Sequence, residues 1–388
     1  MAAIEQLAGL QAEMTAWRRH LHAHPETAFE EHETSAFVAE RLASFGIDVH
    51  RGLAGTGIVG TLSVGEGPMI GLRADMDALP LEERNDFAHR STRPGKMHAC
   101  GHDGHTAMLL GAACYLAETR RFRGTVCFIF QPAEENEAGG RVMVEQGLFE
   151  KFPVSAVYGM HNWPGMPVGS IGLRPGPMMA ASDVFEIVVS GRGCHAAMPQ
   201  LGTDAVLAAS AIVSALHTLV GRIIDPLEAA IVSVTQLHAG NTWNVIPEHA
   251  LLRGTVRSFK ETVQDALEAA IRNTAEAIAA AHRCTADVRY DRGYPVTVND
   301  PDATRGAARA AALVVGDAGV ERDPTPSMGS EDFAFMLRER PGCYVWLGSG
   351  SADGGCVLHN PRYDFNDAIL SIGASYWTTL VETQLPTG

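Results

Sequence analysis

The chain has 388 residues, of which 46% are hydrophobic and 19% charged, and its formal net charge is −15 at pH 7. This length exceeds one ordinary hydrophobic core and predicts two domains. The acidic balance argues against nucleic acid and anionic membrane as partners, because both are bound through basic surfaces. Seven scattered cysteines, no basic and apolar leader, and no apolar run of about 20 residues predict a cytoplasmic protein.

The first half of the chain alternates helical and strand patterns. Apolar residues at helical spacing, or in short continuous runs, define these elements. In order, the expected elements are helices over 4–22 and 34–45, strands over 58–64 and 69–72, a helix over 103–118, and strands over 125–130 and 156–160. This alternation predicts an α/β catalytic domain with a largely parallel mixed sheet flanked by helices.

The pattern changes near residue 180 and returns near residue 295. Between these points the expected order is strand, helix, strand, strand, helix, strand, which is the ferredoxin-like arrangement. The expected elements cover 183–189, 203–223, 230–237, 249–257, 263–282 and 285–290. We therefore expect a catalytic domain of residues 1–181 and 295–388, interrupted by a smaller α+β domain of residues 182–294.

Four sulfur and nitrogen donors lie close together in residues 97–105, namely Cys100 and three histidines, His98, His102 and His105. Cysteine and histidine are the side chains that hold borderline-soft divalent metals. Cys100 and His102 come just before an expected helix, whose dipole would lower the thiol pKa and favour a ligating thiolate.

Further candidate ligands follow expected strands elsewhere in the chain: Glu134, Glu135, His161 and His359. Five or six donors exceed the needs of one zinc ion and predict two metal ions about 4 Å apart. Adjacent side chains of an extended segment point to opposite sides. One glutamate of the pair could therefore bind metal while its neighbour faces the attacking water as a general base.

Nine stretches in family order resemble the M20 metallopeptidase/amidohydrolase family. The resemblance is to its aminoacylase-like subgroup of hippurate hydrolases, N-acyl-L-amino acid amidohydrolases and indole-acetyl-amino-acid hydrolases. The stretches are residues 18–26, 73–80, 97–108, 131–135, 159–164, 194–199, 244–247, 328–334 and 358–367.

The resemblance implies a site with two divalent metal ions per subunit and Glu134 as general acid/base. The implied metal ligands are Cys100, His102, Glu135, His161 and His359. The donor set does not separate Zn²⁺, Mn²⁺, Co²⁺ and Ni²⁺. The resemblance also implies that the inserted domain closes over the site and mediates a homodimer or higher homo-oligomer.

Three further residues take roles from the resemblance. His195 would bind substrate or stabilise the tetrahedral intermediate, Asn244 would bind the substrate, and Asp77 would orient a metal ligand during catalysis. One position departs from the subgroup. The residue directly before this histidine is commonly glycine in the subgroup, whereas in this chain it is Cys194.

The resulting hypothesis is a metal-dependent amidohydrolase that cleaves the amide bond of N-acyl amino acids by attack of a metal-bound hydroxide. Three alternatives stay open: a dipeptidase or aminopeptidase of the same family, a catalytically silent metal-binding relative, and a Cys100 nucleophile. Of the other histidines, His98 and His105 are expected to support the site. His20, His22 and His24 are expected to make surface or backbone contacts.

Overall fold

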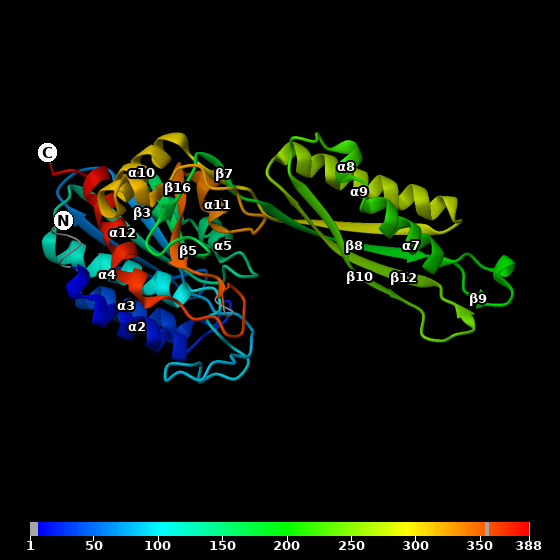
Figure 1. Cartoon of the computed structure of the whole chain (residues 1–388), viewed down its shortest axis with the longest axis horizontal. Helices are drawn as coiled ribbons and strands as arrows, with labels where there is room; N and C mark the ends of the chain where they lie inside the picture. Colours follow the sequence, from blue (N-terminus) through cyan, green and yellow to red (C-terminus); the bar gives the residue numbers. More distant parts are fainter. Residues whose placement is uncertain (1–6, 354–356, 388) are drawn as a thin grey trace. The chain divides into compact units, whose positions relative to one another are not determined.

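The computed structural model describes residues 7–353 and 357–387, which form two compact units (Figure 1). The first unit is built from the chain up to Met178, from Val298–Thr325 and from Asp332 onward. The second contains Met179–Thr297 and Pro326–Glu331. The short segment 326–331 differs from the expected division, which left it in the catalytic domain. It joins the second unit because the Ala180 amide donates to the carbonyl oxygens of Ser327 (3.0 Å) and Gly329 (2.9 Å).

The first unit is organised around an eight-stranded sheet with the order β1-β2-β4-β3-β5-β16-β6-β15. Its four central strands, β4, β3, β5 and β16, run parallel, and β1, β2 and β6 introduce antiparallel pairs. The bounds are β1 Asp48–Leu53, β2 Gly57–Val64, β3 Met69–Asp75, β4 Gly124–Gln131, β5 Ala156–Pro164, β6 Ile171–Gly172, β15 Val320–Glu321 and β16 Gly342–Gly350. The prediction of a largely parallel mixed sheet is confirmed.

Helices cover this sheet, and α4 packs against β3. Helices α2, α3 and α12 contact α4, α10 contacts α12, and α5 and α11 contact each other and the strands β4 and β5. The bounds are α2 Gln11–Ala23, α3 His32–Ser44, α4 His102–Thr119, α5 Gly139–Glu145, α6 Leu148–Lys151, α10 Pro301–Val315, α11 Phe333–Glu339 and α12 Leu370–Gln384. Within the described residues, no helix combines the length and apolar character needed to cross a bilayer.

Two differences from the expected elements have simple causes. The strand β1 was not expected, because Asp48–Leu53 is mostly exposed and carries no apolar alternation. The first long helix begins at Gln11, and the expected start near Ile4 lies outside the described residues.

The second unit has a four-stranded antiparallel sheet with the order β10-β12-β8-β13. Helices α7 and α9 pack on it and on each other around a core of aliphatic side chains. The bounds are β8 Ala181–Ser190, β9 Cys194–His195, α7 Ala205–Leu216, α8 Val220–Ile223, β10 Ala230–Ala239, β11 Val245–Ile246, β12 His249–Ser258, α9 Glu261–Ala281 and β13 Thr285–Tyr294. Numbered along the unit, its four long strands lie in the order second, third, first, fourth, which is the ferredoxin-like arrangement.

Candidate metal centre

The parallel strands place several polar side chains at one edge of the sheet. In the β3–β4 ladder Asp75 lies opposite Gln131, and in the β3–β5 ladder Arg73 lies opposite Gly159. The strands β3, β4 and β5 therefore reach the same edge of the sheet at their carboxyl ends. Asp77, the Glu134–Glu135 pair and His161 lie at this edge. This is the usual position of functional residues in α/β sheets.

Cys100 and His102 reach the same edge through a tight turn into α4. Gly101, between them, has a left-handed φ of 96°. A Cβ atom at this position would lie 2.2 Å from Asn162 Oδ1, so only glycine fits. His102 is then the first residue of α4, and both side chains are buried.

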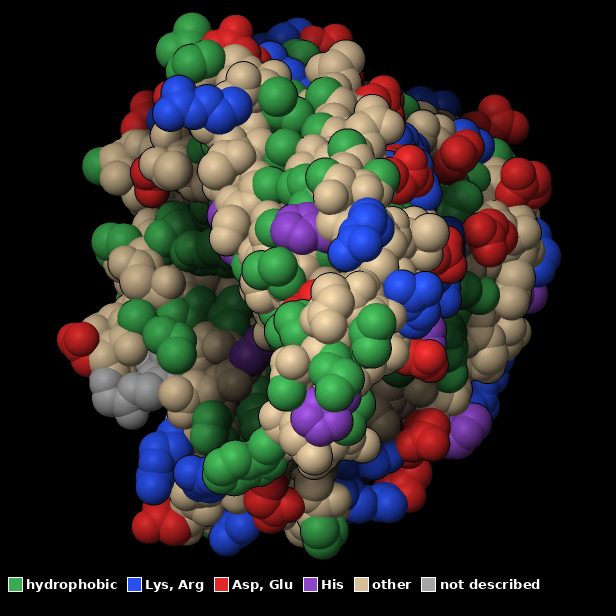
Figure 2. All heavy atoms as spheres, turned by 90° about the vertical axis from the view of Figure 1, so that its right-hand side faces the viewer, with side chains coloured by type: hydrophobic (Ala, Val, Ile, Leu, Met, Phe, Trp, Pro, Cys, Tyr) green, Lys and Arg blue, Asp and Glu red, His purple; other side chains and the backbone are tan. Residues whose placement is uncertain are grey.

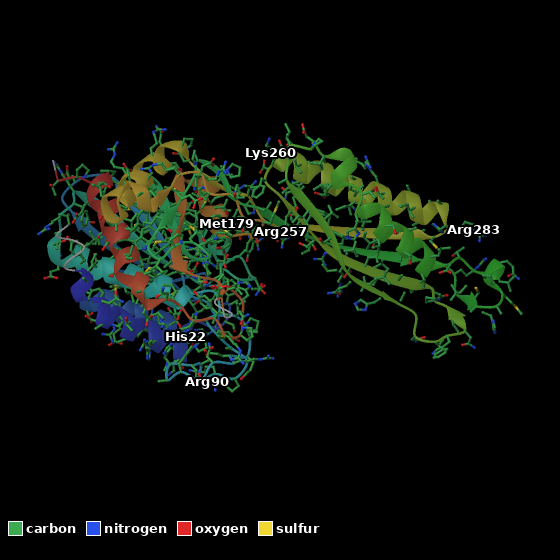
Figure 3. The ribbon with its side chains drawn as sticks, viewed as in Figure 1. His22, Arg90, Met179, Arg257, Lys260 and Arg283 are labelled. Atoms are coloured by element: carbon green, nitrogen blue, oxygen red, sulfur yellow. The ribbon has the colours of Figure 1, made fainter. Side chains whose placement is uncertain are left out.

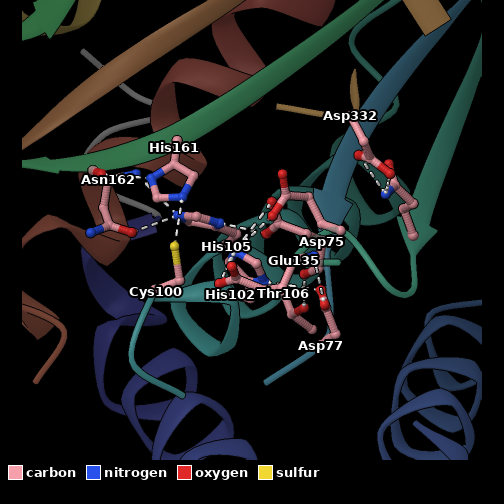
Figure 4. A network of polar contacts seen from close by, with 12 residues as sticks. Asp75, Asp77, Cys100, His102, His105, Thr106, Glu135, His161, Asn162 and Asp332 are labelled. Carbon is pink, nitrogen blue, oxygen red and sulfur yellow. Dashed lines mark hydrogen bonds and ion pairs between the residues drawn. The ribbon is translucent and has the colours of Figure 1, made fainter. Parts of the chain in front are cut away.

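Donor atoms from six residues on four separate segments lie close together, and Figure 4 shows Cys100, His102, Glu135 and His161 among them. Cys100 Sγ is 3.3 Å from His161 Nε2, and His102 Nε2 is 3.9 Å from Glu135 Oε1. Donors that share one tetrahedral metal ion lie roughly 3–4 Å apart, given bonds of about 2.0–2.3 Å. Three of the groups whose ligand atoms lie within 4.8 Å of one another are formed by these six residues: Cys100, His102 and His161; Cys100, Glu135 and His359; and His102, Glu134 and Glu135.

Neighbouring groups orient the two buried imidazoles. Nδ1 of His102 lies 3.1 Å from Asp77 Oδ1, and Nδ1 of His161 lies 2.7 Å from the carbonyl oxygen of Asn162. In each ring Nδ1 is therefore the donor, so that Nε2 is the nitrogen that carries the lone pair when the ring is neutral. Asp77 also accepts the backbone amide of Glu135 through Oδ2 (3.0 Å), so one carboxylate fixes two of the grouped residues.

The glutamate pair is not extended, contrary to the argument from sequence. Glu134 and Glu135 lie in a turn that follows Ala133, which has a left-handed φ of 54°. Both side chains consequently approach His102 Nε2, Glu134 Oε2 at 4.0 Å and Glu135 Oε1 at 3.9 Å. Glu135 has two further contacts, since its backbone amide donates to Asp77 and its Oε2 lies 3.3 Å from His359 Nε2.

His359 enters the group from the C-terminal part of the chain. Its backbone has a left-handed φ of 64°, and its amide donates to the carbonyl oxygen of Ala99 (2.8 Å). This bond ties the His359 loop to the Cys100 loop. The side chain is 54% exposed, and its Nε2 is 3.3 Å from Glu135 Oε2.

Two buried atoms at the centre of the group have no hydrogen-bond partner among the described residues, namely His102 Nε2 and Glu135 Oε1. A buried polar atom without a partner costs about 1–3 kcal/mol, more if it is charged. Asp75, Asp77 and Glu134 add negative charge in the same buried region. A divalent cation would satisfy both atoms and balance this charge, so these residues fit a metal ion.

The electrostatics of the thiol differ from the expectation based on the helix dipole. Burial, followed by the charges of Glu135 and Glu134, raises the pKa of the Cys100 thiol well above its usual range. The helix terminus is therefore not sufficient to ionise Cys100. A bound cation reverses this balance, because a coordinating thiol is deprotonated. Burial, together with His105, lowers the pKa of His161 well below its usual range and keeps it neutral.

A second set of buried contacts supports this edge of the sheet. His105 Nδ1 lies 2.6 Å from Asp75 Oδ1, and its Nε2 lies 2.7 Å from Asn162 Oδ1. Arg73 donates to Asp75 Oδ2 (2.6 Å) and to Asp332 Oδ1 (3.0 Å). Figure 4 shows the sequence of contacts from Asn162 through His105 to Asp75.

His195 and Asn244 belong to the second unit and lie next to each other there. His195 pairs with Val245 in the β9–β11 ribbon, and Ala196 donates to the carbonyl oxygen of Asn244 (3.0 Å). The His195 side chain is exposed. Apolar side chains are also exposed on this unit, which faces the viewer in Figure 2. They include Met198, Leu201, Leu207, Trp243 and Val245.

Sequence reasoning missed one group of residues beside the site. His22, expected at the surface, is fully buried between Asp103 and Glu83. The signal that could have found it is helical spacing, because Arg18 and His22 are four residues apart on α2. His24 behaves as expected, since its Nδ1 contacts the carbonyl oxygen of His20 (2.8 Å).

Comparison with known proteins identifies the family. Residues 71–383 match the model of peptidase family M20/M25/M40. The chain is 40% identical to an N-acetyl-L-cysteine deacetylase of Bacillus subtilis over 96% of this chain and 88% of the relative. It is 39% identical to a hippurate hydrolase of Campylobacter jejuni over 98% of both chains. A crystal structure of a dinuclear metal-binding peptidase of the M20 family from Bacillus subtilis superposes with a TM-score of 0.84 at 36% identity, covering 97% of this chain and 99% of that one. The matches span nearly the whole chain, which therefore belongs to peptidase family M20/M25/M40.

Proposed function

We propose that this protein is a metal-dependent amidohydrolase that releases amino acids from N-acyl amino acids. The observation that carries the proposal is the group of sulfur, nitrogen and oxygen donors whose central atoms, His102 Nε2 and Glu135 Oε1, have no hydrogen-bond partner within the described residues. Two relatives of about 40% identity are named for hydrolysis of N-acetyl-L-cysteine and of hippurate, which supports this substrate class.

We infer that two divalent ions would be held, because the donors form two groups that share Cys100. One group adds His102 and His161, and the other adds Glu135 and His359. When bound, the ions supply Lewis acidity to the substrate carbonyl and lower the pKa of water. Zn²⁺, Mn²⁺, Co²⁺ and Ni²⁺ all suit these ligands.

Within this proposal Glu134 moves the proton. Its carboxylate is buried beside His102, whereas Glu135 is held by Asp77 and contacts His359. Glu134 would take a proton from the attacking water and pass it to the amide nitrogen, so that the amine leaves neutral. Asp77 would keep His102 in the tautomer whose Nε2 can bind metal.

The second unit supplies two more residues to the proposal. We infer that His195 stabilises the oxyanion and that Asn244 contacts the substrate, which their adjacency in the β9–β11 ribbon supports. We further propose a homo-oligomer, which the exposed apolar side chains of this unit support. The cytoplasmic location stays a prediction from sequence.

The experiment compares N-acetyl and N-benzoyl amino acids with a free dipeptide such as Gly-Phe. We expect amino acid release from the acylated compounds, loss of this release with EDTA, and recovery with one of the four metals. Hydrolysis confined to the dipeptide would instead assign a dipeptidase, and activity that survives thorough chelation would refute the metal mechanism.

The roles of the two glutamates can be separated by substitution. Glu134→Gln is expected to keep bound metal and to lower kcat by about 10²–10⁴-fold, the usual contribution of a general base. Glu135→Gln is expected to lose metal. Glu137→Gln is a matched control, because Glu137 is exposed in the same turn. Metal loss in the Glu134 variant with retention in the Glu135 variant would reverse the two assignments.

A further inference from the structure

Helix α2 turns two of its polar side chains into the protein and leaves their neighbours outside. Arg18 is 1% exposed and His22 is 0% exposed, whereas Arg19 and His20 are exposed. Residues four apart share one face of a helix. Burying an arginine and a histidine costs free energy unless both are paired with polar or charged groups. The groups that pair with them therefore indicate the role of this helix face.

Arg18 joins two distant segments of the first unit, the first turn of α4 and the stretch of chain just before α12. Its Nη1 lies 3.7 Å from Asp103 Oδ2 and 2.9 Å from Asp364 Oδ1. Its Nε lies 2.7 Å from Asp367 Oδ1. A guanidinium group is suited to this arrangement, because its planar donors can reach several carboxylates at fixed angles.

His22 holds the same aspartate from a second direction. Its Nδ1 is 2.9 Å from Asp103 Oδ2, and its Nε2 is 3.2 Å from Glu83 Oε1. Burial opposes protonation, but the hydrogen bonds to the two carboxylates outweigh it and raise the pKa of His22 to about 9. Figure 3 marks His22 on α2 and Arg90 in the loop between β3 and α4, which also contains Glu83.

Three of the carboxylates that Arg18 and His22 contact lie close in sequence to His102 or His359, which are candidate metal ligands. Asp103 directly follows His102 in the first turn of α4. Asp364 follows His359 in the same loop, and Asp367 begins the short 3₁₀ helix Asp367–Ile369 that leads into α12. Restraining Asp103 fixes the start of α4 and with it the backbone of His102. Restraining Asp364 and Asp367 limits how far the His359 loop can move.

We propose that Arg18 and His22 are positioning residues for the metal centre. They contact none of the candidate metal ligands themselves, and they act by holding in register the first turn of α4, which bears His102, and the loop that bears His359. The inference rests on the proposed function, because it requires His102 and His359 to be metal ligands. A cluster with a purely structural role would affect folding but not the affinity of the folded protein for metal.

The first test replaces each of the neighbouring arginines by lysine. Arg18→Lys keeps the charge but loses the fork that reaches three carboxylates. We expect Zn²⁺ affinity, measured by competition with a chromogenic chelator, to fall about tenfold, as for other residues that orient metal ligands. Arg19→Lys is the matched control, because Arg19 contacts the same Asp367 from the surface (2.9 Å) and should leave affinity unchanged.

The second test separates the two contacts of His22. Asn places its amide nitrogen near the Nδ1 position, so His22→Asn keeps a donor to Asp103. Gln places its amide nitrogen near the Nε2 position, so His22→Gln keeps a donor to Glu83 only. We expect His22→Asn to bind Zn²⁺ nearly as the parent does and His22→Gln to bind it about tenfold more weakly. This pair decides the proposal if Arg18→Lys does not fold.

The unfolding of the metal-free variants is measured alongside. Lower metal affinity in the folded Arg18→Lys and His22→Gln variants supports positioning. Parental affinity in both, with only the unfolding midpoint lowered, overturns it and leaves a structural cluster. If the parent protein itself binds no divalent metal, the proposed function fails first and the inference falls with it. If the parent binds metal and these variants match it, only the inference falls.

Discussion

Asp77 is the residue whose replacement tests the geometry of the metal centre most directly. Its Oδ1 faces Nδ1 of His102 at 3.1 Å, and its Oδ2 accepts the backbone amide of Glu135 at 3.0 Å. Both neighbours are donors, and the carboxylate accepts from both. Asp77→Asn keeps the size but leaves only one acceptor oxygen. If that oxygen stays with Glu135, the new amide group donates to His102 Nδ1, which moves the ring proton to Nε2 and blocks the atom that would bind metal.

The size of the effect follows from the contact that is lost. A hydrogen bond to a charged group contributes about 1.5–3 kcal/mol. Loss of a residue that orients a metal ligand costs about 10–100-fold in affinity, which is about 1.4–2.7 kcal/mol. The two estimates agree, so we expect Zn²⁺ affinity in a chelator competition to fall by one to two orders of magnitude.

The control for this prediction is Asp48→Asn, which removes the same charge from an exposed position on β1. It should bind metal as the parent does. Unchanged metal affinity in a folded Asp77→Asn protein would refute the reasoning, because it would mean that His102 does not depend on Asp77 for its tautomer. Circular dichroism of both variants establishes that they are folded.

Three further predictions concern the support of the site. Gly101→Ala places a Cβ 2.2 Å from Asn162 Oδ1 at a left-handed φ, so metal affinity should drop and the free energy of unfolding should fall by about 3 kcal/mol in chemical denaturation. The pKa of His22 is about 9 in the folded chain, above its ordinary 6.5. The stability that its ring contributes is therefore complete below pH 6.5 and lost as the pH rises through 9. At most, the free energy of unfolding of the parent falls by about 3 kcal/mol between pH 6 and 10. The free energy of unfolding of a His22→Asn variant should vary less over this pH range. Arg73→Met removes the cation that pairs with the fully buried Asp75 and Asp332, so it should cost at least about 3–5 kcal/mol in unfolding, and a smaller loss would contradict this estimate.

Much of the fold was predictable because it depends on local patterns. The apolar run before Gln131 is typical of a strand buried on both faces, and it is β4 at the centre of the sheet. Once strands and helices alternate, the carboxyl ends of parallel strands meet at one edge. The meeting of His161 with the glutamate turn after β4 follows from that rule.

The parts that could not be predicted depend on contacts between distant segments or on backbone angles. The left-handed Ala133 turns Glu134 and Glu135 to the same side, and nothing in their sequence neighbourhood shows this φ. The burial of His22 requires knowing that Asp103 lies beside it, although the two are far apart in sequence. The raised pKa of the Cys100 thiol likewise results from carboxylates that only the folded chain brings near.

These long-range contacts share a common arrangement around the first turn of α4. Arg73 contacts Asp75, which in turn contacts His105. Arg18 and His22 both contact Asp103. Both arginines are almost completely buried, at 0% and 1% exposure, and each offsets the charge of carboxylates that the site needs. The turn that begins with His102 is therefore held through His105 and through Asp103 by ion pairs that do not involve the candidate metal ligands. Because the protein restrains these donors before any ion arrives, metal binding need not order the turn, and removing either arginine is expected to weaken metal binding more than removing a surface charge.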